Sequence, residues 1–326
     1  MKSIKNIAVL TSGGDAPGMN AAIRAVVRTA CHFNLNVYGI KHGYEGLIDD
    51  EFSLMTETDV SNIIQLGGTI LRTARSERFR TEQGMEQAIL NLNKHSIDGL
   101  VIIGGDGSYK GAAALAARMP LQVIGIPGTI DKDLSGTDTT LGFDTAVNTA
   151  MYAIDKIRDT AEAHDRIFFV EVMGRDAGYI ALNAGLTTGA EAILIPETKT
   201  YINHLVQLLE RGWKRKKKSH IIIVAEGDDA GGAIQVSEAV KKQFNSIESR
   251  VTILGHLQRG GSPTMADRLL GTRWGFAAIE ALIQGKSGIA LGIKNGEINE
   301  TSLEIVNKEH PGLSEEMMRM LYILSN

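Results

Sequence analysis

The sequence predicts an α/β fold in which helices cover both faces of mainly parallel sheets. Short apolar runs alternate along the chain with longer amphipathic segments, the order produced by strand–helix–strand units. Most of the short runs contain no polar alternates, as expected for parallel strands that are buried on both faces. Most of them also end in a glycine-rich loop that carries Asp, Arg or His, which gathers polar groups at one edge of each sheet.

The expected elements follow from this alternation. The apolar runs predict strands at 7–10, 37–40, 99–103, 122–126, 166–172, 192–195, 220–225 and 251–254. Apolar positions that recur with helical spacing predict helices at 20–33, 109–119, 144–164 and 201–216.

Composition limits the class of protein. The 326 residues are enough for two domains of ordinary size. A net charge of −4 excludes a global basic field that would recruit nucleic acid or a membrane surface. The single cysteine, Cys31, excludes an internal disulfide framework and a multi-cysteine zinc site. The first apolar run, 7–10, is too short for a secretion signal, and no run approaches the roughly 18 residues of a membrane span. We therefore expect a soluble cytoplasmic protein.

Two glycine-rich loops have the form that binds phosphate. "TSGGDAPG" (11–18) and "GGDGSYKG" (104–111) each join a predicted strand to a predicted helix, where backbone N–H groups favour an anion. Neither is a Walker motif or a dinucleotide fingerprint, so a simple tight turn explains each equally well on its own. Asp106 lies between glycines that leave room for a cation such as Mg²⁺ carried by a nucleotide. The alternative is that Asp106, or Ser108, caps the helix at 109–119.

A carboxylate pair and several arginines extend the pattern. In "PGTIDKD" (127–133), Asp131 and Asp133 follow a buried strand, where an isolated pair would more often be a solvated turn. Arg175 and Arg259 lie among glycines at strand ends and suit phosphate oxygens, whereas we expect Arg72 and Arg78 to be solvated. Phosphate loops, a metal-type aspartate, arginines and a carboxylate that can accept a hydroxyl proton together indicate phosphoryl transfer.

Five motifs carry a resemblance to a known family. "TSGGDAPGMNAAIR", "GGDGSYKGA", "PGTIDKD", "VEVMGRDAG" and "LGHLQRGGSPTMADR" occur in order over nearly the whole chain and closely resemble bacterial ATP-dependent 6-phosphofructokinases. The resemblance implies transfer of the ATP γ-phosphate to the 1-hydroxyl of fructose 6-phosphate. It implies two doubly wound, Rossmann-like domains with the active site in the cleft between them. The larger, ATP-binding domain would comprise 1–142 and 258–310, and the smaller, sugar-phosphate-binding domain 143–257 and 311–326.

The resemblance also assigns roles within the site. Asp131 would be the base, Thr129 and Arg175 would stabilise the transferring group, and Asp106, assisted by Asp133, would hold Mg²⁺. The residues expected to bind ATP are Gly14, Tyr44, Arg75, Ser76, Gly105, Asp106, Gly107 and Ser108, and Gly14 and Arg75 are also expected to take part in catalysis. The residues expected to bind fructose 6-phosphate are Thr129, Ile130, Asp131, Arg166, Met173, Gly174, Arg175, Glu226, Arg250, His256, Leu257, Gln258 and Arg259.

Regulation and assembly are also implied by the resemblance. The protein would be a homotetramer in which Arg166 and Arg250 reach the 6-phosphate bound in a neighbouring subunit. An effector site between subunits would bind ADP or phosphoenolpyruvate. The residues expected there are Arg24, Arg28, Arg158, Gly189, Ala190, Glu191, Arg215, Lys217, Lys218 and Ser219.

The sequence departs from the family pattern beside the chemistry. Lys132 replaces the usual Asn between the two aspartates and adds a cation near the expected metal. "ARSERF" lacks the proline–glutamate that usually follows the arginine. Gly107 and Gly128 favour ATP over pyrophosphate as the donor. Two alternatives stay open: a pyrophosphate-dependent enzyme of the same fold, and a sugar-phosphate or nucleotide sensor without turnover.

Overall fold

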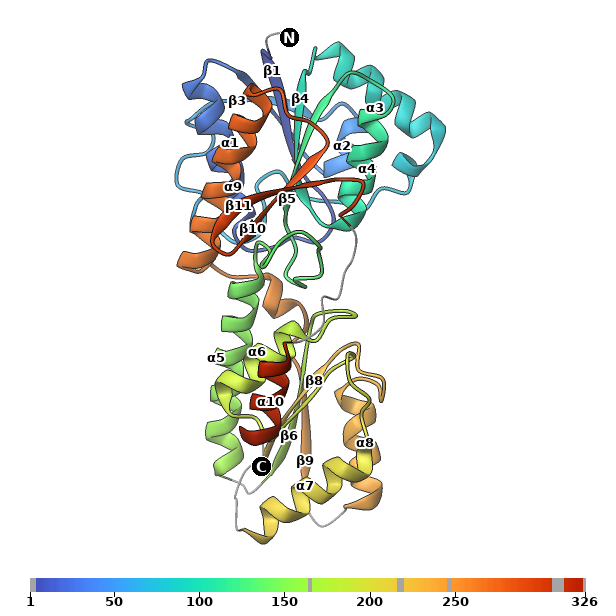
Figure 1. Cartoon of the computed structure of the whole chain (residues 1–326), viewed down its shortest axis with the longest axis vertical. Helices are drawn as coiled ribbons and strands as arrows, with labels where there is room; N and C mark the ends of the chain where they lie inside the picture. Colours follow the sequence, from blue (N-terminus) through green and yellow to red (C-terminus); the bar gives the residue numbers. More distant parts are fainter. Residues whose placement is uncertain (1–3, 164–165, 216–219, 245–247, 307–313, 325–326) are drawn as a thin grey trace. The chain divides into compact units, whose positions relative to one another are not determined.

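The computed structural model describes residues 4–163, 166–215, 220–244, 248–306 and 314–324. The chain divides into two compact units, here called unit 1 and unit 2. Unit 1 comprises Met1–Thr145 with Arg259–Glu309, and unit 2 comprises Ala146–Gln258 with His310–Asn326. Both units are α/β with mainly parallel sheets, so the predicted fold class is confirmed (Figure 1).

Unit 1 is built on a seven-stranded sheet in the order β11-β10-β5-β4-β1-β2-β3. The strands are β1 (Asn6–Thr11), β2 (Asn36–Ile40), β3 (Phe52–Met55), β4 (Gly99–Gly104), β5 (Gln122–Pro127), β10 (Ile289–Lys294) and β11 (Glu297–Ser302). The central strands are parallel, whereas the two edge strands, β3 and β11, run antiparallel to their neighbours. The sequence predicted β1, β2, β4 and β5 and missed the other three.

Helices cover both faces of this sheet. They are α1 (Met19–His32), α2 (Gly43–Ile48), the 3₁₀ helix η1 (Arg78–Arg80), α3 (Glu82–Lys94), α4 (Asp106–Ala116) and α9 (Met265–Ile283). α1 and α9 pack side by side on one face, and α2, α3 and α4 lie on the other (Figure 1). Glycine allows α1 and α9 to approach each other closely: a Cβ at Gly275 of α9 would lie 2.6 Å from the carbonyl oxygen of Ala22 in α1.

Unit 2 has a four-stranded parallel sheet in the order β7-β8-β6-β9. Its strands are β6 (Ile167–Val172), β7 (Ala192–Leu194), β8 (His220–Ala225) and β9 (Ser249–Ile253). The accompanying helices are α5 (Phe143–Glu162), which begins in unit 1, α6 (Tyr179–Thr188), α7 (Ile202–Lys214), α8 (Ala233–Gln243), the 3₁₀ helix η2 (Gly255–Arg259) and α10 (Glu315–Leu324). Phe169, Leu209 and Ile222 are fully buried in its core. Among the described helices, none combines the length and the apolar character that crossing a membrane requires.

Candidate active site

Three of the predicted loops meet at the carboxyl edge of the unit 1 sheet, because β5, β4 and β1 are neighbours. The backbone N–H of Ser12 donates to the carbonyl oxygen of Ile103 at 3.0 Å, and that of Gly128 donates to Gly104 at 3.0 Å. The Ser108 hydroxyl donates to the carbonyl oxygen of Ser12 at 3.2 Å. The loops after β1, β4 and β5 therefore form one connected edge.

The glycines of "GGDG" serve different purposes. A Cβ on Gly104 would lie 2.6 Å from the carbonyl oxygen of Ser12, so only glycine permits this contact between loops. A Cβ on Gly105 or Gly107 would meet no atom within 4 Å. Space is therefore open at the start of α4, where helix N–H groups favour an anion.

Asp106 is the first residue of α4, so the helix begins three residues before the predicted Tyr109, and the alternative in which Asp106 or Ser108 caps it is wrong. Gly105 holds the N-cap position instead. The Asp106 Oδ2 atom accepts from Lys110 Nζ at 2.8 Å, while the buried Oδ1 atom has no hydrogen-bond partner in the described part of the chain. A hard carboxylate oxygen without a donor, beside open space, fits a cation.

The predicted carboxylate pair is buried in a bent loop. Asp131 is 1% exposed and Asp133 is 5% exposed. The Asp131 N–H donates to the Thr129 hydroxyl oxygen at 3.2 Å. Lys132 has φ +55°, a left-handed conformation, so the alternation of a regular strand does not apply to the two aspartates.

The Lys132 side chain is accounted for by local packing. Its Nζ lies 5.1 Å from the centre of the Phe143 ring, within the range of a cation–π contact. Burial lowers the pKa of the Lys132 ammonium, and the nearby Asp138 opposes that shift. Among the described residues, no group of three His, Cys, Asp or Glu side chains could hold a metal ion alone. A magnesium ion here would therefore rely on phosphate and water ligands as well.

Arg259 lies against the first glycine loop. A Cβ on Gly14 would be 2.6 Å from the Arg259 Nη1 atom, which donates to the carbonyl oxygen of Asp15 at 3.0 Å. Arg259 is 9% exposed. The other members of η2 differ, because Gln258 is buried whereas His256 and Leu257 are exposed. The predicted phosphate ligands His256 and Arg259 therefore have opposite environments.

Tyr44, Arg75 and Ser76 belong to the same face of unit 1. The Tyr44 hydroxyl donates to the carbonyl oxygen of Ser108, and its ring stacks on Phe79 with centroids 4.1 Å apart. Burial raises the pKa of Tyr44. The Ser76 hydroxyl oxygen accepts from the Phe79 N–H at 3.0 Å, and Arg75 is exposed. Phe79, the last residue of "ARSERF", therefore packs on Tyr44 of α2, whose hydroxyl in turn reaches the start of α4.

Unit 2 joins the loops after β6 and β8. The Arg175 N–H donates to the Glu226 Oε1 atom at 2.7 Å, and the Glu226 N–H donates to Val172 at 3.0 Å. Arg175 has φ +53°, and the preceding Gly174 has φ +143°. These positive φ values turn the chain sharply after β6. The predicted substrate ligands Met173, Gly174, Arg175 and Glu226 thus lie together at the carboxyl ends of β6 and β8.

Arg166 and Arg250 lie at the other end of this sheet. Arg166 immediately precedes β6 and Arg250 is the second residue of β9. Both side chains bind the carboxylate of Glu248, with Arg166 Nε 2.7 Å from its Oε2 atom. Arg166 lowers the pKa of Glu248. A strand of six residues spans roughly 20 Å, so within one chain these arginines are far from Arg175 and Glu226.

Part of the predicted effector site is also assembled in unit 2. Arg158 of α5 donates to the carbonyl oxygens of Thr188, at 2.5 Å, and Gly189, at 3.3 Å. Ala190 is buried beside them, and the Glu191 Oε2 atom accepts from the Ile221 N–H at 2.5 Å. The remaining predicted members are elsewhere: Arg24 and Arg28 lie on α1 of unit 1, Arg215 follows α7, and Lys217, Lys218 and Ser219 lie outside the described residues.

Sequence reasoning missed Asp267, a buried residue of α9. Its Oδ1 atom accepts from the Gly142 N–H at 2.8 Å, and its Oδ2 atom accepts from the Thr145 N–H at 2.8 Å and hydroxyl at 2.6 Å. Burial raises the pKa of Asp267, and these hydrogen bonds oppose the shift. Asp267 thereby holds the first turn of α5. The signal in the sequence was an acid placed three residues after Thr264, the N-cap of α9.

Sequence reasoning also underestimated Arg78, which was expected to be solvated. Its side chain is 56% exposed, yet it forms ion pairs with Glu45 and Asp49. Arg72 is exposed, and it has φ +56°.

The fold and the site together define an α/β phosphotransferase, with glycine-rich loops, buried carboxylates and arginines at the carboxyl edges of parallel sheets. A model of the phosphofructokinase family matches residues 6–282. The chain belongs to the phosphofructokinase family.

Curated relatives match the chain over its whole length. It is 50% identical to ATP-dependent 6-phosphofructokinase 2 of Bacteroides thetaiotaomicron, over 100% of both chains. It is 51% identical to ATP-dependent 6-phosphofructokinase 1 of Thermus thermophilus, over 99% of this chain and 100% of that one. A solved phosphofructokinase of Saccharomyces cerevisiae matches 98% of this chain with a TM-score of 0.87 and 36% identity, and the match spans 48% of the yeast chain.

Proposed function

We propose that this protein is an ATP-dependent 6-phosphofructokinase, which transfers the γ-phosphate of MgATP to the 1-hydroxyl of fructose 6-phosphate in glycolysis. Membership of the family and full-length relatives at half identity support the activity. The observation that carries it within the structure is the connected edge of unit 1, where the loops after β1, β4 and β5 bring a phosphate-type helix start together with the loop of Asp131.

Asp131 is proposed as the base. It accepts the proton of the 1-hydroxyl as that oxygen forms a bond to the γ-phosphorus and the bond to the ADP oxygen breaks. Burial at 1% exposure and the hydrogen bond of its N–H to Thr129 keep this loop in one geometry. Thr129 and Arg175 are proposed to stabilise the charge on the transferring group, with Gly14 and Arg75 on the nucleotide side.

Asp106 and Asp133 are the residues that would hold magnesium. The Oδ1 atom of Asp106 lacks a donor among the described residues, and the open space beside Gly105 and Gly107 leaves room for a nucleotide. When bound, Mg²⁺ neutralises charge on the ATP phosphates.

Gly107 and Gly128 favour ATP over pyrophosphate as the donor. Gly107 leaves open space, whereas a Cβ on Gly128 would lie 3.2 Å from the Gly104 nitrogen. A bulkier residue at either position would reduce the space for a nucleotide or move the loop after β5. The alternative donor, pyrophosphate, is tested directly below.

Sugar-phosphate binding is proposed for residues at both strand ends of unit 2 and for Arg259 of unit 1. Met173, Gly174 and Glu226 are proposed to contact the sugar, and His256 with Arg259 to bind the 6-phosphate. Arg166 and Arg250 are proposed to reach the site of a neighbouring subunit in a homotetramer, because they lie at the opposite strand ends. ADP or phosphoenolpyruvate is proposed to bind near Arg158 and Glu191. We place the enzyme in the cytoplasm, since its charged substrates do not cross membranes unaided.

A coupled assay of fructose 1,6-bisphosphate formation tests the function. The purified protein is given fructose 6-phosphate with ATP or with pyrophosphate, each with and without ADP. We expect turnover with ATP and Mg²⁺ that is lost when EDTA is added. Turnover with pyrophosphate alone would instead identify the pyrophosphate-dependent enzyme. Binding of both ligands without turnover under any condition would identify a sensor.

A further inference from the structure

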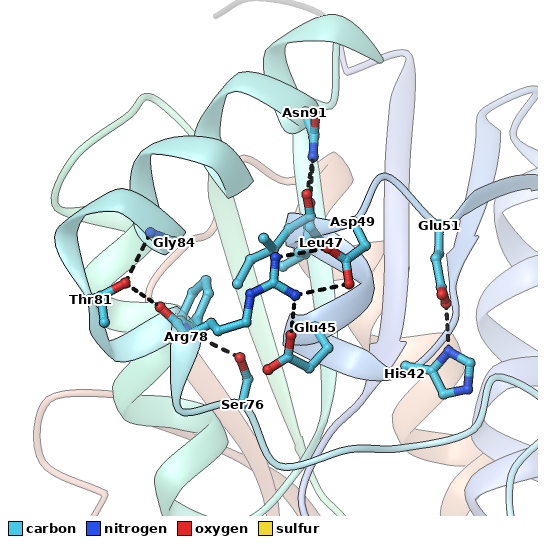
Figure 2. A network of polar contacts seen from close by, with 12 residues as sticks. His42, Glu45, Leu47, Asp49, Glu51, Ser76, Arg78, Thr81, Gly84 and Asn91 are labelled. Carbon is cyan, nitrogen blue, oxygen red and sulfur yellow. Dashed lines mark hydrogen bonds and ion pairs between the residues drawn. The ribbon is translucent and has the colours of Figure 1, made fainter.

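Arg78 makes a forked contact with α2. Its Nη1 atom donates to the Glu45 Oε2 atom at 2.9 Å and to the Asp49 Oδ2 atom at 3.0 Å, and its Nη2 atom donates to the Asp49 Oδ1 atom at 2.8 Å (Figure 2). The two nitrogens thus bind both oxygens of one carboxylate, the strongest geometry for an arginine ion pair. The contact joins η1 to a helix about thirty residues earlier in the chain.

The segment around Arg78 is anchored at several further atoms. The Phe79 N–H binds the Ser76 hydroxyl oxygen at 3.0 Å, and the Phe79 ring stacks on Tyr44 of α2. The Thr81 hydroxyl donates to the Arg78 carbonyl oxygen at 2.7 Å (Figure 2). A Cβ on Gly84 would lie 2.0 Å from that same oxygen, so glycine is needed there. Together these contacts hold 76–81 against α2 and α3.

A second tether holds the chain just before Arg75. The Thr73 hydroxyl donates to the carbonyl oxygen of Gly13 at 2.7 Å, and the Thr11 hydroxyl donates to that of Arg72 at 2.7 Å. Between this tether and η1, the chain at 73–76 has no regular secondary structure. Arg75 is exposed in the middle of this segment. The direction in which Arg75 points therefore depends on the anchors on either side.

We propose that Arg78 is a positioning residue for the nucleotide: its fork to Asp49 and Glu45 clamps the segment that presents Arg75 and Ser76 to ATP. The proposal rests on the proposed function, because it takes Arg75 and Ser76 as nucleotide ligands. The carboxylates of Asp49 and Glu45 also keep the Arg78 guanidinium from competing for the phosphates.

The geometry distinguishes this contact from an ordinary surface ion pair. Single exposed pairs contribute little, but forked arginine–carboxylate pairs within a network are the exception. Arg78 lowers the pKa of Asp49 through its hydrogen bonds. Since the folded-state pKa of Asp49 lies below its ordinary value of 3.8, the pair is complete above that pH and is lost only as the pH falls through the lower value. The clamp is therefore intact at neutral pH.

The test measures nucleotide affinity by titration calorimetry with ADP and with β,γ-imido-ATP, in excess Mg²⁺. The variants are Arg78→Gln, Asp49→Asn, the double variant, and Arg78→Lys. The matched control is Arg118→Gln, which breaks the ion pair of Arg118 with Glu82 in the same unit. Kinetics with fructose 6-phosphate and the melting temperature are measured for each protein.

We expect Arg78→Gln to weaken nucleotide binding by roughly fivefold. Asp49→Asn should have a smaller effect, because Glu45 still holds Arg78. The double variant should bind no more weakly than Arg78→Gln alone, since both changes break one contact. The nucleotide affinity of Arg78→Lys should lie between those of the wild type and Arg78→Gln, because an ammonium keeps the charge but is not a planar fork. The KM for fructose 6-phosphate should stay at its wild-type value in these variants. The control, Arg118→Gln, should match the wild type in nucleotide affinity and in kinetics.

Several outcomes would overturn the clamp. They are unchanged nucleotide affinity in Arg78→Gln, strictly additive effects in the double variant, or an equal rise in the KM for fructose 6-phosphate. Absence of any nucleotide binding in the wild type would also overturn it. A different result would disprove the proposed function and leave the clamp standing. In that case the wild type binds nucleotide, Arg78→Gln binds it more weakly as expected, and yet the wild type forms no fructose 1,6-bisphosphate.

Discussion

The two groups of predicted phosphate ligands are held in opposite ways. In unit 1, Arg259 is 9% exposed and its guanidinium lies against the backbone of Gly14 and Asp15. In unit 2, Arg166 and Arg250 share one half-exposed carboxylate, Glu248. Buried contacts to the backbone fix a side chain in one geometry, whereas an exposed ion pair without a bidentate fork contributes little. Arg259 is therefore held by the backbone of its own chain, whereas the partner of Arg166 and Arg250 is a carboxylate that a phosphate could replace, which is why we propose that these two arginines serve a neighbouring subunit.

The largest effect is expected where the unit 1 edge carries the chemistry. Asp131→Ala should lower kcat by roughly 10²- to 10⁴-fold, the usual contribution of a positioned base. The KM for fructose 6-phosphate should change much less, because Asp131 acts on the proton rather than on the phosphate. Steady-state kinetics on both substrates provides the measurement. A variant that kept near-normal kcat would show that another group is the base and that the buried edge is a scaffold only.

The next effect concerns how this buried edge is held together. Asp267→Ala should lower the free energy of unfolding by about 3 kcal/mol, because the buried N–H groups of Gly142 and Thr145 lose their acceptor. Asp59→Ala is the matched control: Asp59 accepts two hydrogen bonds from Thr56 but is exposed, so water replaces it and the loss of unfolding free energy should be much smaller. Urea unfolding curves compare the two. Equal losses of unfolding free energy in the two variants would mean that burial does not set the cost of removing these hydrogen bonds.

The smallest effect separates backbone strain from charge at Lys132. Its left-handed φ suits Asn better than Lys, and its ammonium lies over Phe143. Lys132→Ala should lose about 0.5–1 kcal/mol of cation–π attraction, whereas Lys132→Asn should recover most of that by relieving the backbone. Thermal unfolding of both variants is compared with the wild type. Equal destabilisation by Ala and Asn would exclude strain at this position. A Mg²⁺ titration of Lys132→Asn shows in addition whether the cation affects the metal.

The sequence predicted the parts of the fold that depend on uniform burial. β1, β4 and β5 are continuous apolar runs, and the order of their glycine-rich loops was enough to place them at one edge. β3 and β11 were missed because edge strands are partly exposed, and the pattern along β11 is mainly polar. β10 was missed although its central residues are buried.

Contacts between distant segments could not be predicted in this way. The fork of Arg78 depends on α2 lying beside η1, and the role of Asp267 depends on α9 lying beside the start of α5. Neither contact leaves a periodic signal in the sequence, because each depends on one side chain that meets a partner far along the chain. The bend at Lys132 was missed for a related reason: a left-handed conformation at a lysine has no compositional mark.

The central claim is that one chain supplies the nucleotide edge and its neighbour supplies Arg250. Two variants that we expect to be inactive test it: Asp131→Ala, which lacks the proposed base, and Arg250→Ala, which lacks the arginine proposed to come from the neighbour. They are dissociated, mixed and allowed to reassociate, and hybrids are identified by native mass analysis. In a hybrid, one site has both defects, and the other combines Asp131 from one chain with Arg250 from the other. We predict that activity reappears in the mixture and in neither parent. Hybrids that form and stay inactive would show that Arg250 acts within its own subunit, which would contradict the account.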